Sequence, residues 1–209
     1  MATTVQSAQP YHHGDLRAAL IRAALEAFER EGSEGVSLRG LAETVGVSRS
    51  APYSHFRSKR ELMAAIAEVG YERFVAEMER VDDDANDRER FLAIGEGYLR
   101  FALENPGLFK LMFSADLALL KGVGDLENKS ARAFGVFQQG LNAFLIHGGG
   151  AASASTALQT LAWSSVHGLT FLLLEERLPV RPEQPIVLIR EVTGLFADMA
   201  EAWLSSARQ

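Results

Sequence analysis

Residues 36–62 read VSLRGLAETVGVSRSAPYSHFRSKREL, and this stretch decides the fold of the first part of the chain. Ser37 is a good N-cap for a short helix whose apolar positions are Leu38, Leu41, Ala42 and Val45. Gly46-Val47-Ser48 interrupts that pattern, and a second short helix is predicted from Ser48 to about Phe56. Two short helices joined by a tight turn, with a helix before and a long helix after, are typical of a helix-turn-helix.

The second short helix is the part expected to enter a nucleic-acid groove. Ser48 would cap its N-terminus, where free N–H groups and the helix dipole favour a phosphate. The side chains expected to point outward are Arg49, Ser50, Ala51, Tyr53 and His55. They combine hydrogen-bonding groups with small apolar ones, as the reading of base edges requires. Pro52 lies at the end of the first turn, where it costs at most about one backbone hydrogen bond.

A local basic island surrounds this motif, although the whole chain has a net charge of −6. Within residues 35–60 one acidic residue, Glu43, stands against Arg39, Arg49, Arg57, Lys59 and Arg60, which gives a local charge of +4. A basic face of this kind fits a polyanion. A cluster of this size is also common on ordinary solvated surfaces, so the charge supports the motif without deciding its role.

The remaining sequence predicts an all-α fold of about nine helices, because apolar residues recur with helical spacing and no alternating strand pattern occurs. Ser58 and Glu61 have the spacing of a capping box, and Asn105-Pro106 looks like an N-cap followed by the first helical residue. The other expected helices cover Asp15–Arg30, Ser58–Arg80, Arg88–Glu104, Leu108–Phe113, a segment with Phe134 to Phe144, Ala152–Glu175 and a last helix with Ile189 to Trp203. The acidic run at residues 82–84 separates two expected domains, 12–75 and 82–209.

Composition narrows the class of protein. The chain has 209 residues and no cysteine, so disulfides, cysteine-based metal sites and thiol nucleophiles are excluded. Neither a signal peptide nor a membrane span is expected, which favours a cytoplasmic protein. No glycine-rich phosphate loop, zinc-protease motif or serine-nucleophile motif is found, so no enzyme, cofactor or metal site is predicted. His12-His13 has no partner at ligand spacing, and the alternatives there are a disordered arm or a phosphate or minor-groove contact.

The motif in residues 36–62 closely resembles the DNA-binding domain of the tetracycline-repressor (TetR) family. The matching features are Ser37, Leu41-Ala42, Gly46-Val47-Ser48, Tyr53 to Phe56 with His55 between them, and Lys59 followed by Leu62. The resemblance covers about residues 12–75. It implies phosphate contacts from Ser37, Ser48, Tyr53, His55 and Lys59, positions near the base edges for Arg49, Ser50, Ala51 and Pro52, and a structural role for Phe56.

The second half resembles one subtype of TetR C-terminal domain, marked by a Trp…His-Gly signature at Trp163, His167 and Gly168. Trp163 and His167 are four residues apart, so they lie on the same side of one helix. Tentative ligand-binding residues are Phe101, Phe109, Met112, Phe113, Phe137, Leu141, Trp163, His167 and Phe171. Each of these is also a candidate for the hydrophobic core, and a core histidine is the commoner interpretation of His167.

The last helix has a wide apolar face that needs a partner, either the core of its own chain or a second subunit. The resemblance implies a homodimer that pairs through the last two helices. The expected function is that of a sequence-specific regulator of transcription, most often a repressor that leaves a palindromic DNA operator when a small, largely apolar effector binds. Two alternatives stay open: an activator of the same family, and a helical small-molecule-binding protein without DNA activity.

Overall fold

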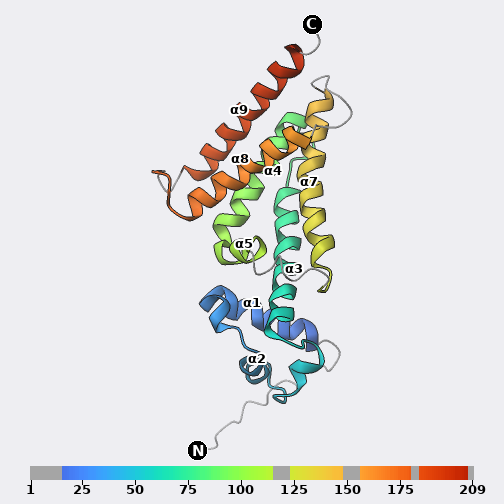
Figure 1. Ribbon diagram of the computed structural model, residues 1–209, viewed down its shortest axis with the longest axis vertical. Helices are drawn as coiled ribbons and strands as arrows, with labels where there is room; N and C mark the ends of the chain where they lie inside the picture. The colour runs from blue at the N-terminus through green and yellow to red at the C-terminus, as the bar shows by residue number, and fades with distance from the viewer. Residues whose placement is uncertain (1–15, 115–122, 148–155, 180–183, 207–209) are drawn as a thin grey trace, which may run out of the picture. The chain divides into compact units, whose positions relative to one another are not determined.

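The computed structural model describes residues 16–114, 123–147, 156–179 and 184–206 (Figure 1). Within these ranges all regular secondary structure is helical, with eight α-helices and one 3₁₀ helix, which confirms the all-α prediction. The chain divides into two compact units, residues 1–62 and 63–209, and helix α3 (Lys59–Met78) runs through the division. The predictions for His12-His13 and for a helix stop at residues 148–150 lie outside the described residues.

Helix α1 (Leu16–Gly35) is longer than predicted and has a kink near its end. Its buried positions include Leu20, Ala24 and Phe28, spaced by four residues as the sequence indicated. The expected stop at residues 31–33 is only partly correct. Gly32 adopts a left-handed conformation with φ of 67°, which breaks the helical geometry, but helical structure resumes up to Gly35.

Helix α2 (Leu38–Val45) begins and ends as predicted. The backbone N–H of Gly40 donates to the Ser37 hydroxyl oxygen at 3.1 Å, which makes Ser37 the N-cap. Gly46 follows the helix with φ of 77°, a left-handed conformation that costs glycine little, and Val47 N–H bonds back to the carbonyl of Ala42 at 2.9 Å. The tight turn of the motif therefore depends on Gly46.

The second short helix differs from the prediction, because it is a 3₁₀ helix covering Ala51–Ser54 and not an α-helix from Ser48 to Phe56. Ser50, not Ser48, stands at its N-cap position, and it makes no side-chain capping bond. The backbone N–H groups of Ala51 and Tyr53 bond to carbonyls three residues earlier. Pro52 explains the difference, since it has no N–H to donate to the Ser48 carbonyl in an α-helical pattern.

Helix α3 (Lys59–Met78) has a modified capping box at its start. The N–H of Glu61 donates to the Ser58 hydroxyl at 3.3 Å, as predicted. The Glu61 carboxylate, however, accepts from the N–H of Arg57 at 2.8 Å and not from that of Ser58. One of the two capping-box hydrogen bonds is therefore in its usual place, and the other goes to the backbone N–H of the residue before Ser58.

The second unit is organised around helix α4 (Asp87–Glu104), which packs against α5 (Pro106–Met112), α7 (Leu126–His147), α8 (Thr156–Leu174) and α9 (Pro185–Ser206). Figure 1 shows α8 and α9 next to each other, and the two helices are in contact.

A capping box of Asn86 and Glu89 begins α4. Asn105 does stand at the N-cap of α5, but its side-chain amide donates to the Phe101 carbonyl of α4. The Asn105 side chain therefore supplies a hydrogen-bond donor to a carbonyl group in the last turn of α4 and does not cap α5.

Helix α8 contains 19 residues without a lysine, arginine, aspartate or glutamate, and it is long and apolar enough to cross a membrane. The expectation of no membrane span rested on the interruption of apolar stretches by charges or glycine, and in α8 Gly168 supplies that interruption. Length and composition do not separate a membrane span from a core helix. In the second unit α8 packs against α4, α7 and α9, with Ala162, Val166 and Thr170 buried.

Two glycines of α4 allow close approach of neighbouring helices. A Cβ at Gly97 would lie 2.2 Å from the carbonyl oxygen of Glu77 and 3.0 Å from the Cα of Met78, both at the end of α3. A Cβ at Gly95 would lie 2.9 Å from Cγ2 of Thr193 in α9. At Gly97 the neighbour is backbone, which cannot rotate away, so α3 and α4 pack closely only because this residue has no side chain.

We expect Gly97→Ala to lower the free energy of unfolding by about 1–3 kcal/mol, because the added methyl group forces α4 away from α3. The matched control is Gly135→Ala in α7, where a Cβ would meet nothing within 4 Å. The control should be neutral or stabilising by up to about 1 kcal/mol, because alanine favours helix more than glycine does. Urea unfolding at equal protein concentration measures both, and equal stabilities would contradict the packing.

Candidate functional site

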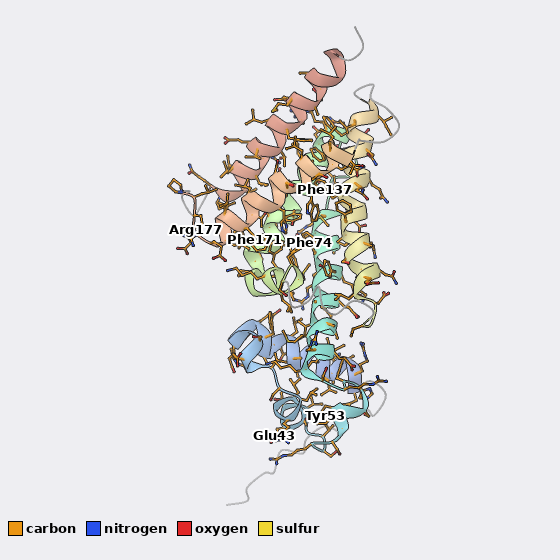
Figure 2. All side chains as sticks on the ribbon, viewed as in Figure 1. Glu43, Tyr53, Phe74, Phe137, Phe171 and Arg177 are labelled. Carbon is orange, nitrogen blue, oxygen red and sulfur yellow. The ribbon has the colours of Figure 1, made fainter. Side chains whose placement is uncertain are left out.

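The first unit presents a polar face built from the helix-turn-helix. Seven of the predicted DNA-binding residues are exposed: Ser37, Ser48, Arg49, Ser50, Tyr53, His55 and Lys59. Tyr53 is 47% exposed, which is unusual for a large aromatic residue without a partner. Figure 2 labels Tyr53 and Glu43 at the same end of this unit. Ala51 is half-buried and Pro52 is buried, so the proline ring itself packs inside the unit.

The core behind this face fixes the angle between the two short elements. Leu41 and Ala42 of α2 are buried, and Phe56 is 2% exposed, in keeping with the structural role predicted for it. The guanidinium of Arg17 in α1 lies 5.4 Å from the centre of the Phe56 ring. Sequence reasoning missed Arg17, because a contact between residues so far apart in sequence leaves no periodic signal.

Several polar groups on the face already have partners inside the unit. Lys59 Nζ donates to the Ser33 carbonyl at 2.5 Å. Arg49 Nη2 donates to Glu43 Oε1 at 3.0 Å, and the hydroxyls of Ser48 and Ser50 are 3.2 Å apart. An ammonium group has three donors and a guanidinium five, so Lys59 and Arg49 keep donors for an acceptor outside the protein. The face can therefore donate hydrogen bonds to phosphates or to base edges.

The second unit contains a continuous aromatic cluster. The rings within contact distance of one another belong to Tyr71, Phe74, Phe91, Tyr98, Phe101, Phe109, Phe113, Phe134, Phe137, Phe144, Trp163, His167, Phe171 and Phe196. Figure 2 labels three of them, Phe74 of α3, Phe137 of α7 and Phe171 of α8. Trp163 and His167 stack with ring centres 5.8 Å apart and planes at 15°, as their spacing on one helix predicted.

A hydrogen bond between Tyr98 and His167 lies at the centre of this cluster. The Tyr98 hydroxyl and His167 Nδ1 are 2.5 Å apart. Burial raises the pKa of the Tyr98 phenol well above its usual value, so the hydroxyl keeps its proton. The described residues offer this hydroxyl no other acceptor, so it donates to Nδ1. The hydrogen of the neutral imidazole then sits on Nε2, which is a donor.

Exposure divides the predicted ligand-binding residues into two groups. Five of them are buried: Phe101, Phe109, Met112, Phe137 and Leu141. The other four are half-buried: Phe113, Trp163, His167 and Phe171. Trp163, His167 and Phe171 follow one another at intervals of four residues on α8, so one side of that helix carries three of the four half-buried residues.

Sequence reasoning missed Tyr98 and the residues of α3 that touch the cluster. Tyr71 donates its hydroxyl to the carbonyl of Met112 at 2.9 Å, and burial raises the pKa of Tyr71 to about 12. Phe113 contacts Tyr71 and Phe74 as well as the rings of α8. The available signal was the number of aromatic residues between 71 and 113, but their sequence spacing does not show which rings meet.

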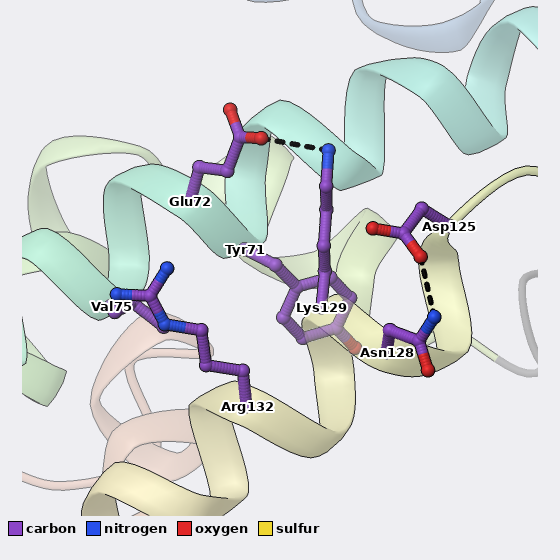
Figure 3. Close-up of a pocket in the computed structure, with 7 residues that line it drawn as sticks. All are labelled: Tyr71, Glu72, Val75, Asp125, Asn128, Lys129 and Arg132. Carbon is purple, nitrogen blue, oxygen red and sulfur yellow. Dashed lines mark hydrogen bonds and ion pairs between the residues drawn. The ribbon is translucent and has the colours of Figure 1, made fainter.

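A polar cleft between α3 and α7 lies apart from the predicted ligand-binding residues (Figure 3). Its volume is about 200 Å³, and Lys129 pairs there with Glu72 at 2.7 Å and with the buried Glu68 at 3.4 Å. Asp125 N–H also donates to Glu68, so that the carboxylate stabilises the N-terminus of α7. The residues that line the cleft include two cations, Lys129 and Arg132, and two carboxylates, Glu72 and Asp125, so the lining has no net charge and shows no preference for a charged ligand. The ion pairs of Lys129 hold α7 against α3.

The geometry defines a helix-turn-helix protein with a separate helical domain, and the comparisons with known proteins agree. Residues 91–195 match the family described as the tetracyclin repressor-like C-terminal domain. Residues 20–66 match the bacterial regulatory proteins of the tetR family. Because the first of these matches spans half of the chain, the chain belongs to the TetR family. The Trp…His-Gly subtype stays a prediction.

Two curated relatives match less than half of the chain. The tetracycline repressor protein class A from transposon 1721 of Escherichia coli is 44% identical over 42% of this chain and 45% of its own length. The nucleoid occlusion factor SlmA of Marinobacter nauticus is 32% identical over 44% of this chain and 48% of its own length. The chain thus matches about half the length of these relatives.

Solved structures resemble the fold over most of the chain. A protein with unknown function from Rhodococcus sp. RHA1 has a TM-score of 0.70 and 28% identity, and the alignment covers 93% of this chain and 98% of that one. The TetR family transcriptional regulator PfmR from Thermus thermophilus has a TM-score of 0.59 and 20% identity over 86% of this chain and 97% of its own. The second likeness concerns the fold alone.

The hydrogen bond of His167 predicts a pH dependence of stability. Burial lowers the pKa of His167 in the folded protein from 6.5. When the pH falls from 6.5 towards this lower value, the unfolded chain binds a proton that the folded chain does not, so the free energy of unfolding decreases. In the His167→Gln variant the free energy of unfolding should therefore fall less as the pH is lowered.

His55→Gln is the matched control, because it makes the same substitution at an exposed position. Urea unfolding between about pH 7 and pH 5 measures the slope for the three proteins. A His167→Gln protein with the full wild-type slope would show that His167 is not the group whose folded-state pKa is lowered.

Proposed function

We propose that this protein is a homodimeric regulator of transcription that binds DNA through residues 37–59. The observation that carries the proposal is the exposed polar face of the helix-turn-helix, which is held rigid by Gly46 and the buried Phe56. Its local charge of +4 fits the phosphate backbone in a chain that is otherwise acidic. The family membership supports the same function.

In this proposal the short 3₁₀ helix and its flanks lie in a major groove. Ser37, Ser48, Tyr53, His55 and Lys59 contact phosphates, which fixes the position of the protein on the DNA. Arg49, Ser50 and Ala51 lie nearest the base edges, and the buried Pro52 ring supports them from behind. Two subunits related by a twofold axis read half-sites about 34–36 Å apart or a multiple of that distance.

The second subunit binds at the apolar surface of α8 and α9. Large apolar side chains that are exposed on these two helices are Leu161, Leu172, Val187, Leu195 and Met199, of which Met199 is 68% exposed. An exposed apolar surface on two adjacent helices is typical of a subunit interface. The exposure of Met199 supports a role in dimerisation.

A small, largely apolar effector binds at Phe113, Trp163, His167 and Phe171, the half-buried rings of the aromatic cluster. His167 Nε2–H and the indole N–H of Trp163 supply hydrogen-bond donors in an otherwise apolar surface. Binding there biases α3 through Phe113, which contacts Tyr71 and Phe74. To release DNA, the effector has to bind the released state more tightly by a few kcal/mol. Repression is the outcome we propose.

Tyr53→Ala should weaken binding several-fold to a specific DNA site and to random DNA alike, because a phosphate contact carries no sequence information. The hydroxyl is uncharged, so the salt dependence of binding should keep its slope. Tyr53→Phe, which removes the hydroxyl alone, should reproduce most of the loss. Gel shifts on DNA flanking the gene of this protein, with random competitor DNA and a salt series, measure these quantities.

A discrete wild-type complex that survives competitor DNA supports the proposed function. If Tyr53→Ala reduces binding to the specific site and spares random DNA, Tyr53 reads a base and its assignment to a phosphate is wrong. Thermal unfolding of both variants checks that the exposed substitutions leave the fold intact.

A further inference from the structure

Glu43 is a charge of the wrong sign on the proposed DNA-binding face. It is the one acidic residue between positions 35 and 60, where five arginine and lysine residues occur. Its side chain is 63% exposed, so it does not serve the core. A carboxylate on a surface that approaches phosphates lowers the affinity for every DNA sequence, and its presence needs another explanation.

The carboxylate of Glu43 holds the side chain of Arg49. Arg49 Nη2 lies 3.0 Å from Glu43 Oε1, and the two residues face each other across the Gly46 turn. The Arg49 side chain is 77% exposed, and an ion pair between two such exposed groups contributes little to stability. Neither folding nor general affinity for DNA therefore accounts for the pair.

An effect on the orientation of the Arg49 side chain does account for the ion pair. A free arginine side chain on a surface samples many rotamers, and ordering it on a base pair costs conformational entropy. A carboxylate that occupies one edge of the guanidinium limits those rotamers and leaves the remaining donors of the planar fork available. That fork matches the O6 and N7 acceptors of guanine in the major groove. The carboxylate also discourages Arg49 from turning to a phosphate instead.

We propose that Glu43 is a positioning residue that holds Arg49 for bidentate recognition of guanine and thereby determines the sequence specificity of the protein. The inference rests on the proposed DNA-binding function. It predicts that Glu43 lowers affinity for random DNA while it raises discrimination at one base pair in each half-site. A residue with a merely structural role would change neither quantity.

The test compares the wild type with Glu43→Gln, Arg49→Lys and the double variant. Glu26→Gln is the matched control, because it removes the same charge from an exposed position on α1. The DNA probes are a site enriched from random sequence by the wild-type protein, its single-base-pair variants and random DNA. Dissociation constants are measured over a salt series.

For Glu43→Gln we expect several-fold tighter binding to random DNA, because the released Arg49 contacts phosphate. The salt slope should become steeper by about 0.9, the value for one additional phosphate contact. Discrimination at one guanine position per half-site should fall about fivefold or more. Arg49→Lys should lose discrimination at the same position, and the double variant should lose no more than either single variant. Glu26→Gln should keep the wild-type discrimination.

Two results would overturn the proposal. Glu43→Gln could keep full discrimination, which would make the ion pair irrelevant to recognition. Alternatively, Glu43→Gln could lose a preference that Arg49→Lys keeps, which would mean that Glu43 itself accepts a hydrogen bond from a cytosine amino group. A wild-type protein that enriches no sequence would instead contradict the proposed function, so the two failures are distinguishable.

Discussion

Helix α3 is the constraint on which the packing of the second unit depends. It begins at Lys59, within the first compact unit, and continues through the second as far as Met78. Along its length Leu62, Ile66 and Phe74 are completely buried. A helix stiffened by its own backbone hydrogen bonds does not bend freely, so the other helices of the second unit pack on a rigid element.

Three kinds of contact hold the other helices of the second unit against α3. Gly97 allows the backbone of α4 to approach the end of α3. Glu68 joins α3 to the first turn of α7 by hydrogen bonds and an ion pair. The aromatic cluster adds the third contact through Phe113, which touches α3 on one side and His167 of α8 on the other. A ligand that moved Phe113 would thus act on α3.

Local features of this fold were predictable from sequence, and contacts between distant residues were not. Ser37 and Gly46 cap α2 as expected, because capping depends on residues within one turn. The 3₁₀ geometry at Ala51–Ser54 was missed because the effect of Pro52 on the hydrogen-bond pattern was treated as tolerable within an α-helix. The Tyr98–His167 bond joins residues 69 positions apart, and no periodic pattern records such a pair. The roles of the individual DNA-binding and ligand-binding residues stay predictions.

Selection of binding sites from random DNA by the wild-type protein tests the account most directly. A homodimer that presents two copies of the Gly46 turn and the polar face around Tyr53 should enrich a palindromic sequence with two half-sites. The centres of those half-sites should lie about 10–10.5 base pairs apart, or a multiple of that spacing. A pool that stays random, with weak binding that disappears as salt rises, would contradict sequence-specific recognition by this helix-turn-helix.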